Sequence, residues 1–126
     1  MIKEKIKTFE DACKALQISE ALPEVSALPE KHQKALIAHY KLITITEALN
    51  EGWQPNWNDL DEYKYQPWFE IDASTEKPSG FGFSYSDYVV WSAATSCGSR
   101  LCFKSRELCL YAIEQFKQIY IDYYLM

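Results

Sequence analysis

The chain has no long apolar run and no secretion signal, and both absences exclude classes of protein. No segment approaches the roughly 18 consecutive apolar residues that a membrane-spanning helix requires. The first seven residues alternate in charge and lack the apolar segment of a signal peptide. We therefore expect a cytoplasmic protein that has no membrane partner.

Basic side chains are also scarce, with 13 Lys and Arg against 18 Asp and Glu and a net charge of −5. Between residues 50 and 76, seven acids stand beside a single base, Lys64. Generic binding to a nucleic-acid backbone needs clustered Lys and Arg. This stretch therefore argues against a general nucleic-acid-binding protein.

The motifs of common enzymes and metal sites are missing as well. The four cysteines include no C-x-x-C pair, and in a reducing compartment we expect free thiols, with Cys102 and Cys109 buried. His32 and His39 share a predicted helix face but lie about 10 Å apart along its axis, too far for one metal ion. Neither G-x-S-x-G nor H-E-x-x-H occurs. We predict no catalytic residue, no metal and no cofactor.

A length of 126 residues, 48% of them hydrophobic, supports one α+β domain that spans residues 1–126. Apolar periodicity predicts three helices. Thr8 and Ser105 are the expected N-caps of the first and last helices. Pro29 suits the first position of the middle helix, and Gly52 suits its end. The predicted helical ranges are 9–16, 29–51 and 106–124.

Three strands are predicted between the second and third helices. Period-two alternation and β-favouring residues indicate strands at 63–72, at 80–85 with an extension to residue 91, and at 100–103. Residues 53–62 are expected to form an irregular loop, and 73–79 a hairpin connection. Pro67 predicts an edge strand or a bulge. The predicted fold is α+β, in the order α-α-β-β-β-α, with three helices packed on a small antiparallel sheet of about three strands.

The aromatic residues are concentrated in the middle of the chain. Of the 4 Trp, 9 Tyr and 6 Phe residues, eleven lie between residues 53 and 91, including every tryptophan. This is more ring surface than a short sheet needs to cover one layer of helices. Either the rings form an aromatic core, or some stay on the surface as a recognition platform. The pattern leaves both interpretations open.

Two binding sites can be built from these rings. In the first, a basic corner formed by Arg100, Lys104 and Arg106, together with the helix N-terminus at Ser105, docks an anion such as a nucleotide phosphate. Neighbouring rings then stack on the base. The alternative is that these cations are ordinary surface groups and that Arg100 pairs with an acid of the 50–76 stretch.

In the second site, the acidic aromatic loop contacts a protein partner, because Trp and Tyr are favoured at interface hot spots. Its alternative is a small aromatic core under the loop. The charge balance favours a protein partner over a nucleotide or single-stranded nucleic acid. A tyrosine-rich end (Tyr120, Tyr123, Tyr124) also allows a self-associating structural role as a homodimer. The candidate binding residues are Trp53, Trp57, Trp68, Phe69, Phe81, Phe83, Tyr85, Trp91, Arg100, Lys104 and Arg106.

Several segments also resemble a known group of proteins. They are residues 8–13 (TFEDAC), 28–36 (LPEKHQKAL), 48–53 (ALNEGW), 67–69 (PWF), 79–83 (SGFGF) and 98–105 (GSRLCFKS). Together they resemble a family of small proteins of phages and prophages of gut Bacteroidales. The resemblance implies a setting, the host cytoplasm, but no mechanism and no site residues. In that setting we expect a non-catalytic protein that binds a host or phage macromolecule or sequesters a signalling nucleotide.

Overall fold

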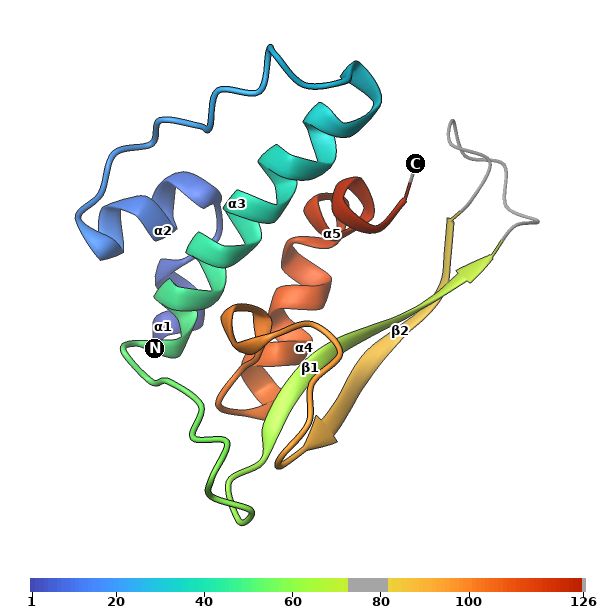
Figure 1. Cartoon of the computed structure of the whole chain (residues 1–126). Helices are drawn as coiled ribbons and strands as arrows, with labels where there is room; N and C mark the ends of the chain where they lie inside the picture. Colours follow the sequence, from blue (N-terminus) through green and yellow to red (C-terminus); the bar gives the residue numbers. More distant parts are fainter. Residues whose placement is uncertain (73–81, 126) are drawn as a thin grey trace.

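The computed structural model of the chain describes residues 1–72 and 82–125, and its architecture is α+β, as predicted. Its elements, in chain order, are α1 (Ile2–Lys5), α2 (Phe9–Leu16), α3 (Glu30–Asn50), β1 (Lys64–Asp72), β2 (Gly82–Trp91), the 3-10 turn η1 (Ser99–Leu101), α4 (Arg106–Gln115) and α5 (Lys117–Tyr124). In Figure 1, α3 runs between α1 and α2 on one side and α4 and α5 on the other. The β1–β2 hairpin lies against α4, on the side away from α2.

Local capping signals set the helix starts where the sequence predicts them. Thr8 Oγ1 accepts a hydrogen bond from the Asp11 amide at 3.0 Å, and α2 covers the predicted residues 9–16. Ser105 Oγ accepts from the Leu108 amide at 3.2 Å. Each cap satisfies an N–H group that has no partner within its helix. The cap predictions at both sites are confirmed.

The middle helix also ends where it was expected to end. Glu51 adopts a left-handed conformation with φ of 50°, and Gly52 follows with φ of 89°. A glycine carries no steric cost in this region, so two successive residues reverse the chain here. The reversal directs the chain away from the end of α3 and toward the start of β1 (Figure 1).

The single helix predicted over 106–124 is divided in two. Phe116 leaves the helical conformation, with φ of −112° and ψ of 27°, and separates α4 from α5. The break changes the direction of the chain, so that α4 packs on both strands while α5 packs on α3. Phe116 itself is buried at the junction. Tertiary packing on two different partners therefore overrides the helical periodicity.

Within residues 1–72 and 82–125, the sheet has two strands rather than the predicted three. β1 and β2 pair antiparallel, with Pro67 opposite Tyr88 and a bulge between Glu70 and Ile71. Both strands are edges, which agrees with the edge position predicted from Pro67. The predicted hairpin connection at 73–79 and the start of the second strand at residues 80 and 81 lie outside the described residues.

The strand predicted at 100–103 is not confirmed. Its first residues form η1, and only Phe103 pairs with β1, through two hydrogen bonds with Tyr65 at 3.0 and 2.7 Å. The backbone on either side of Phe103 is bound to the side chain of Asn50: Nδ2 donates to the Cys102 carbonyl at 2.8 Å, and Oδ1 accepts from the Lys104 amide at 3.1 Å. These two groups point away from β1, so Asn50 holds the outer side of this single bridge.

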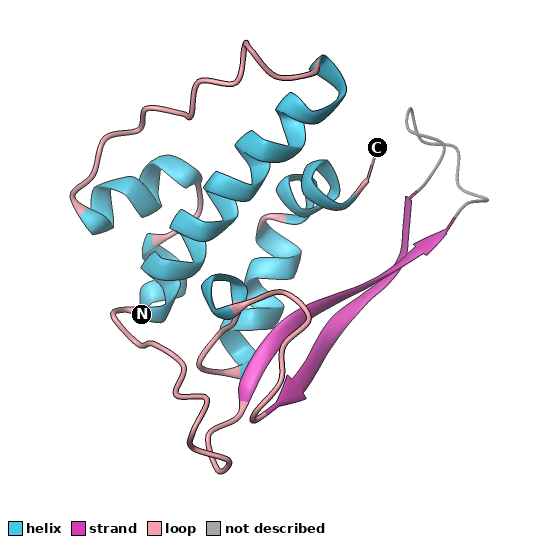
Figure 2. Ribbon diagram, in the orientation of Figure 1, coloured by secondary structure: helices cyan, strands magenta, loops and turns pink. Residues whose placement is uncertain are grey.

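The core lies between the helices and one face of the hairpin. Figure 2 shows helices on one side of the two strands only. The rings that pack on the core from the hairpin are Tyr65, Phe69, Phe83 and Tyr88. Some of the aromatic residues between 53 and 91 thus belong to the core, which agrees with one of the two interpretations of the sequence. Over the described ranges, no helix has the length and apolar character needed to cross a membrane.

Candidate functional site

A pocket of about 390 Å³ opens where the end of α3, the loop after it and η1 meet. This volume falls in the range of about 300–1,000 Å³ that is typical of small-ligand sites. The pocket combines rings, amides and both signs of charge. Its lining residues are Ile43, Thr46, Glu47, Asn50, Trp53, Gln54, Pro55, Trp57, Ser99 and Arg100.

A buried lysine holds the loop that forms one wall. Lys64 is 0% exposed, and its Nζ donates to the carbonyls of Asn56 at 2.6 Å, Asp59 at 3.0 Å and Ser92 at 2.7 Å. These bonds match the three donors of an ammonium group. A buried charge is tolerated only when it is paired and hydrogen-bonded. Lys64 thus fixes the loop 51–63 against the hairpin.

Glu62, the anionic partner of Lys64, also holds this loop in place. Its carboxylate lies 3.4 Å from Lys64 Nζ and accepts from the Asn56 amide at 2.6 Å and from Trp53 Nε1 at 3.2 Å. The Asn56 amide, followed by the side chains of Trp53 and Lys64, lowers the pKa of Glu62 below its usual range. An ionised Glu62 therefore orients the Trp53 ring at the pocket.

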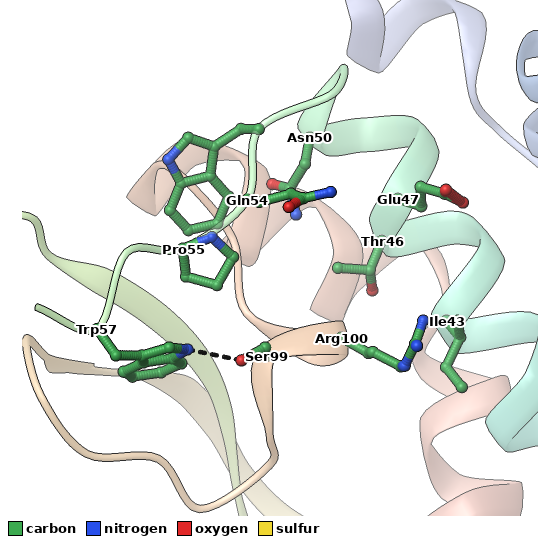
Figure 3. Close-up of a pocket in the computed structure, with 10 residues that line it drawn as sticks. Ile43, Thr46, Glu47, Asn50, Gln54, Pro55, Trp57, Ser99 and Arg100 are labelled. Carbon is green, nitrogen blue, oxygen red and sulfur yellow. Dashed lines mark hydrogen bonds between the residues drawn. The ribbon is translucent and has the colours of Figure 1, made fainter.

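Trp57 joins the loop to η1. Its Nε1 donates to Ser99 Oγ at 2.6 Å, drawn as the dashed line in Figure 3. Lys64 Nζ lies 5.3 Å from the centre of the ring, within cation–π range. With one hydrogen-bond partner and the cation, the ring has a defined position before any ligand binds.

Arg100 supplies the cation of the pocket. In Figure 3 its side chain extends toward Ile43 and Thr46 of α3. Among the residues that the structure describes, Arg100 forms no ion pair. Glu51, an acid of the 50–76 stretch, pairs instead with Lys104 at 3.6 Å. Thr46 Oγ1 is buried and has no hydrogen-bond partner in the described structure. The pocket wall near Arg100 thus includes a buried hydroxyl group, that of Thr46, which is available to bind a ligand.

The other two cations of the predicted basic corner are engaged elsewhere. Lys104 pairs with Glu51, and Arg106 lies 3.9 Å from Glu107. Hydrogen bonding to the Tyr88 side chain, followed by the charges of Tyr88 and Glu107, raises the pKa of Arg106. The three predicted cations do not line one pocket, and only Arg100 belongs to the site described here.

The predicted ring platform is also divided. Phe69 and Phe83 stack on each other with centroids 4.2 Å apart, on the helix side of the hairpin. Trp68 and Trp91 are 40% and 38% exposed. Phe81 and the side chain of Tyr85 lie outside the described part of the structure. Among the candidate rings, the pocket therefore includes Trp53 and Trp57 alone.

The tyrosines of the C-terminal helix pack within the chain. Tyr120 is buried, Tyr123 stacks on His39 at 4.7 Å, and Tyr124 lies 5.4 Å from Phe69, measured between ring centroids. Tyr124 nevertheless remains 36% exposed, so the expected pairing between chains stays a prediction. His39 has an aromatic neighbour rather than an acid that would orient it as a base.

Seven of the ten pocket residues are not among the predicted site residues, and four of these seven are polar and uncharged: Thr46, Asn50, Gln54 and Ser99. Thr46 and Asn50 are polar residues of α3 that are 1% and 4% exposed. A buried polar side chain in an apolar helix needs a partner, and this is the signal that points to them. Gln54 and Ser99 have no comparable signal, because short polar residues are ordinary in loops.

The described residues contain no group of three or more His, Cys, Asp or Glu side chains that could hold a metal ion. No family model, curated protein or solved structure matches this chain. The phage setting expected from sequence resemblance therefore stays a prediction. The site is best described by its geometry: a preformed pocket that is lined by two indoles and by the Arg100 guanidinium, which forms no ion pair within the described ranges, with acidic residues around it.

Proposed function

We propose that the protein is a non-catalytic binding protein and that it engages a protein partner through the pocket and the adjoining acidic loop. One observation carries this proposal: Trp53, Trp57 and Arg100 line a single preformed pocket. Trp and Arg are the residue types most enriched at interface hot spots. The hydrogen bonds of Glu62 and Ser99 hold the two indoles in place, which lowers the entropy cost of binding.

The charges around the pocket define the partner's chemistry. Glu47 lines the pocket, and Asp59 and Asp61 are exposed on the loop that carries the tryptophans. An acidic rim favours a basic segment and raises its association rate. Inside the pocket, Arg100 takes a carbonyl or carboxylate of that segment. A rotation of Thr46 about χ1 would bring its unused hydroxyl to the same group. The partner is thus a basic segment that inserts one apolar or aromatic side chain.

Site-specific photo-cross-linking tests this proposal directly. The photo-reactive residue p-benzoylphenylalanine is placed at Gln54, which lines the pocket and is exposed, and at Glu114, an exposed control on α4. Cells that produce each protein are irradiated, and cross-linked peptides are sequenced. We expect one dominant protein cross-linked from position 54 and not from 114, with Lys or Arg around the attachment point.

Paired charge variants then identify the contact. Arg100→Ala removes the pocket cation, whereas Lys104→Ala removes a neighbouring cation outside it. We expect Arg100→Ala to weaken cross-linking from position 54 about tenfold or more and Lys104→Ala to change it little, with both proteins folded by circular dichroism. Equal effects of the two variants, or equal cross-linking from both positions, would count against a protein site at the pocket.

A nucleotide is the second candidate, because the same three residues suit a phosphate and a base. An indole stacks on a base, and a guanidinium binds a phosphate through paired donors. The acidic rim opposes a polyanion, which limits this candidate to a mononucleotide or a short single strand. Native mass spectrometry of protein purified without refolding distinguishes the two. A retained nucleotide mass, lost in Arg100→Ala, supports the nucleotide; the bare protein mass leaves the protein partner as the better proposal.

A further inference from the structure

Two thiols lie together directly behind the pocket. Cys97 Sγ and Cys102 Sγ are 4.0 Å apart, and both lie near the carbonyl oxygen of Gly98, at 3.6 and 3.2 Å. Thr95 Oγ1 lies 3.9 Å from each sulfur. The two side chains therefore point into one small polar space. A disulfide has an S–S length of about 2.05 Å, so the sulfurs need to approach by about 2 Å.

The two thiols differ in access. Cys97 is half-buried, while Cys102, Cys13 and Cys109 are buried. A reagent in solution therefore reaches Cys97 first. The Gln66 side chain holds Cys97 in place: Gln66 Oε1 accepts from its thiol at 3.2 Å and from the Ser96 amide at 3.0 Å.

The two thiols also differ in how readily each loses its proton. The hydrogen bond from Cys97, then Thr95 and the charge of Lys64, lower the pKa of Cys102. The hydrogen bond to Cys102, then burial and the charge of Cys102, raise the pKa of Cys97. The first proton thus leaves the pair more easily than it leaves an isolated thiol, and the second less easily. One thiolate beside one thiol is the arrangement that disulfide exchange requires.

We propose that Cys97 and Cys102 form a reversible dithiol–disulfide site that small-molecule disulfides, such as oxidised glutathione, oxidise. This inference does not depend on the proposed binding function. Cys102 first loses its proton to solvent; in the first step its thiolate accepts the proton of Cys97, and the Cys97 sulfur attacks one sulfur of the oxidant. A mixed disulfide forms on Cys97, and one glutathione leaves as a thiolate.

In the second step, Cys102 releases its proton to solvent, and its sulfur attacks Cys97 Sγ. The Cys97–Cys102 bond forms, the mixed disulfide breaks, and the second glutathione leaves as a thiolate. Both thiolates take up protons. The protein loses two electrons and two protons, and one glutathione disulfide becomes two glutathione thiols, so the exchange balances.

Oxidation at this site acts on the pocket because the intervening segment contributes to it. Ser99 and Arg100 lie between the two cysteines and line the pocket, and Ser99 accepts the hydrogen bond of Trp57. Gly98 begins this segment, and its φ of 81° is a backbone conformation that glycine adopts without strain. Drawing the sulfurs together shifts Ser99 relative to Trp57. The redox state therefore changes the shape of the pocket wall.

The test is oxidation of the folded full-length protein with oxidised glutathione, followed by alkylation in denaturant and peptide mass mapping. We expect wild-type protein to lose the two thiol hydrogens of Cys97 and Cys102 and to keep Cys13 and Cys109 alkylatable. Dithiothreitol should restore all four thiols. Cys102→Ser should trap glutathione on Cys97, and Cys97→Ser should give neither product. The control variant Cys13→Ala should behave like wild type.

Three results overturn the proposal: folded wild-type protein that stays fully reduced, a mixed disulfide on Cys97 that never resolves, or bonds that involve Cys13 or Cys109. The wild-type result decides the chemistry even if a variant fails to fold. The link to the pocket has its own readout. Oxidation should shift the tryptophan emission of wild-type protein and not that of Cys97→Ser, and an unchanged wild-type spectrum overturns the link.

Discussion

Trp57 Nε1 donates to Ser99 Oγ at 2.6 Å, which joins two residues 42 positions apart in the sequence. The bond closes the pocket wall between the loop after α3 and η1 (Figure 3). Each partner has further support, Trp57 from the cation of Lys64 and η1 from the contacts of Asn50 with the residues after it. The pocket is thus built from long-range contacts that exist before a ligand arrives.

The first prediction concerns this bond. Ser99→Ala removes the acceptor and leaves an indole N–H that solvent still reaches, because Trp57 is only partly buried. We expect a loss of about 1 kcal/mol or less in the free energy of unfolding, and a shift in tryptophan emission. Urea titration followed by fluorescence measures both. Ser26→Ala, an exposed change in the connection before α3, should change neither, and equal spectra for the two variants would contradict the bond.

The second prediction concerns the buried ammonium of Lys64. Lys64→Met keeps much of the side-chain volume but leaves three carbonyls and the Glu62 carboxylate without their partner. Removing one member of a buried pair is costly, so we expect a loss of about 3 kcal/mol or more and a fall in Tm of roughly 10 °C. Thermal unfolding measures it. Lys117→Met, an exposed control, should stay within about 0.5 kcal/mol of wild type.

The third prediction is a pH dependence that comes from Glu62. Its folded-state pKa is lowered, mainly by the Asn56 amide, so it binds protons less readily in the folded than in the unfolded chain. Its stabilisation is therefore complete above the unfolded pKa of about 4.3 and is lost as pH falls through the folded value. Glu62→Gln cannot titrate. The stability gap between wild type and this variant should narrow below about pH 4, and a constant gap would contradict the lowered pKa.

Local signals in the sequence predict the parts of the fold that depend on neighbouring residues. Thr8 and Ser105 mark helix starts because a cap binds an amide three residues away. Gly52 marks an end for a similar reason, since it permits a positive φ. These features need no tertiary contact, and the structure confirms them.

Features that depend on distant contacts were predicted less well. The strand expected at 100–103 gives way to η1 and one bridge because the Leu101 amide bonds to the Gly98 carbonyl within η1, and because Pro67, which would face it on β1, has no N–H. Asn50, 52 residues before Cys102, holds the backbone on the other side of Phe103. The break at Phe116 likewise follows from packing on two different elements. Periodicity reports which residues are apolar, but it does not report what each segment packs against.

In the candidate site, too, residue types were predicted from the sequence, whereas features that depend on distant contacts were not. Trp53, Trp57 and Arg100 were each predicted as binding residues, but the two indoles were grouped with the rings of the whole 53–91 stretch, and Arg100 with Lys104 and Arg106. Their meeting in one pocket depends on the Trp57–Ser99 bond and on the buried charge of Lys64, neither of which has a sequence motif. Residue type thus indicated the chemistry of the site, and tertiary contacts decided its composition.

The last prediction separates the rings of the core from those of the surface. Phe69 packs on Phe83 at 4.2 Å and on Tyr120 at 5.2 Å, while Tyr63, six residues earlier, is 59% exposed. Phe69→Ala should cost about 2–3 kcal/mol, since it opens a space between the hairpin and α5, and Tyr63→Ala should cost about 0.5 kcal/mol or less. Urea unfolding followed by circular dichroism measures both. Similar costs would mean that the hairpin does not pack on the helices through Phe69, and the aromatic core would then have to lie elsewhere.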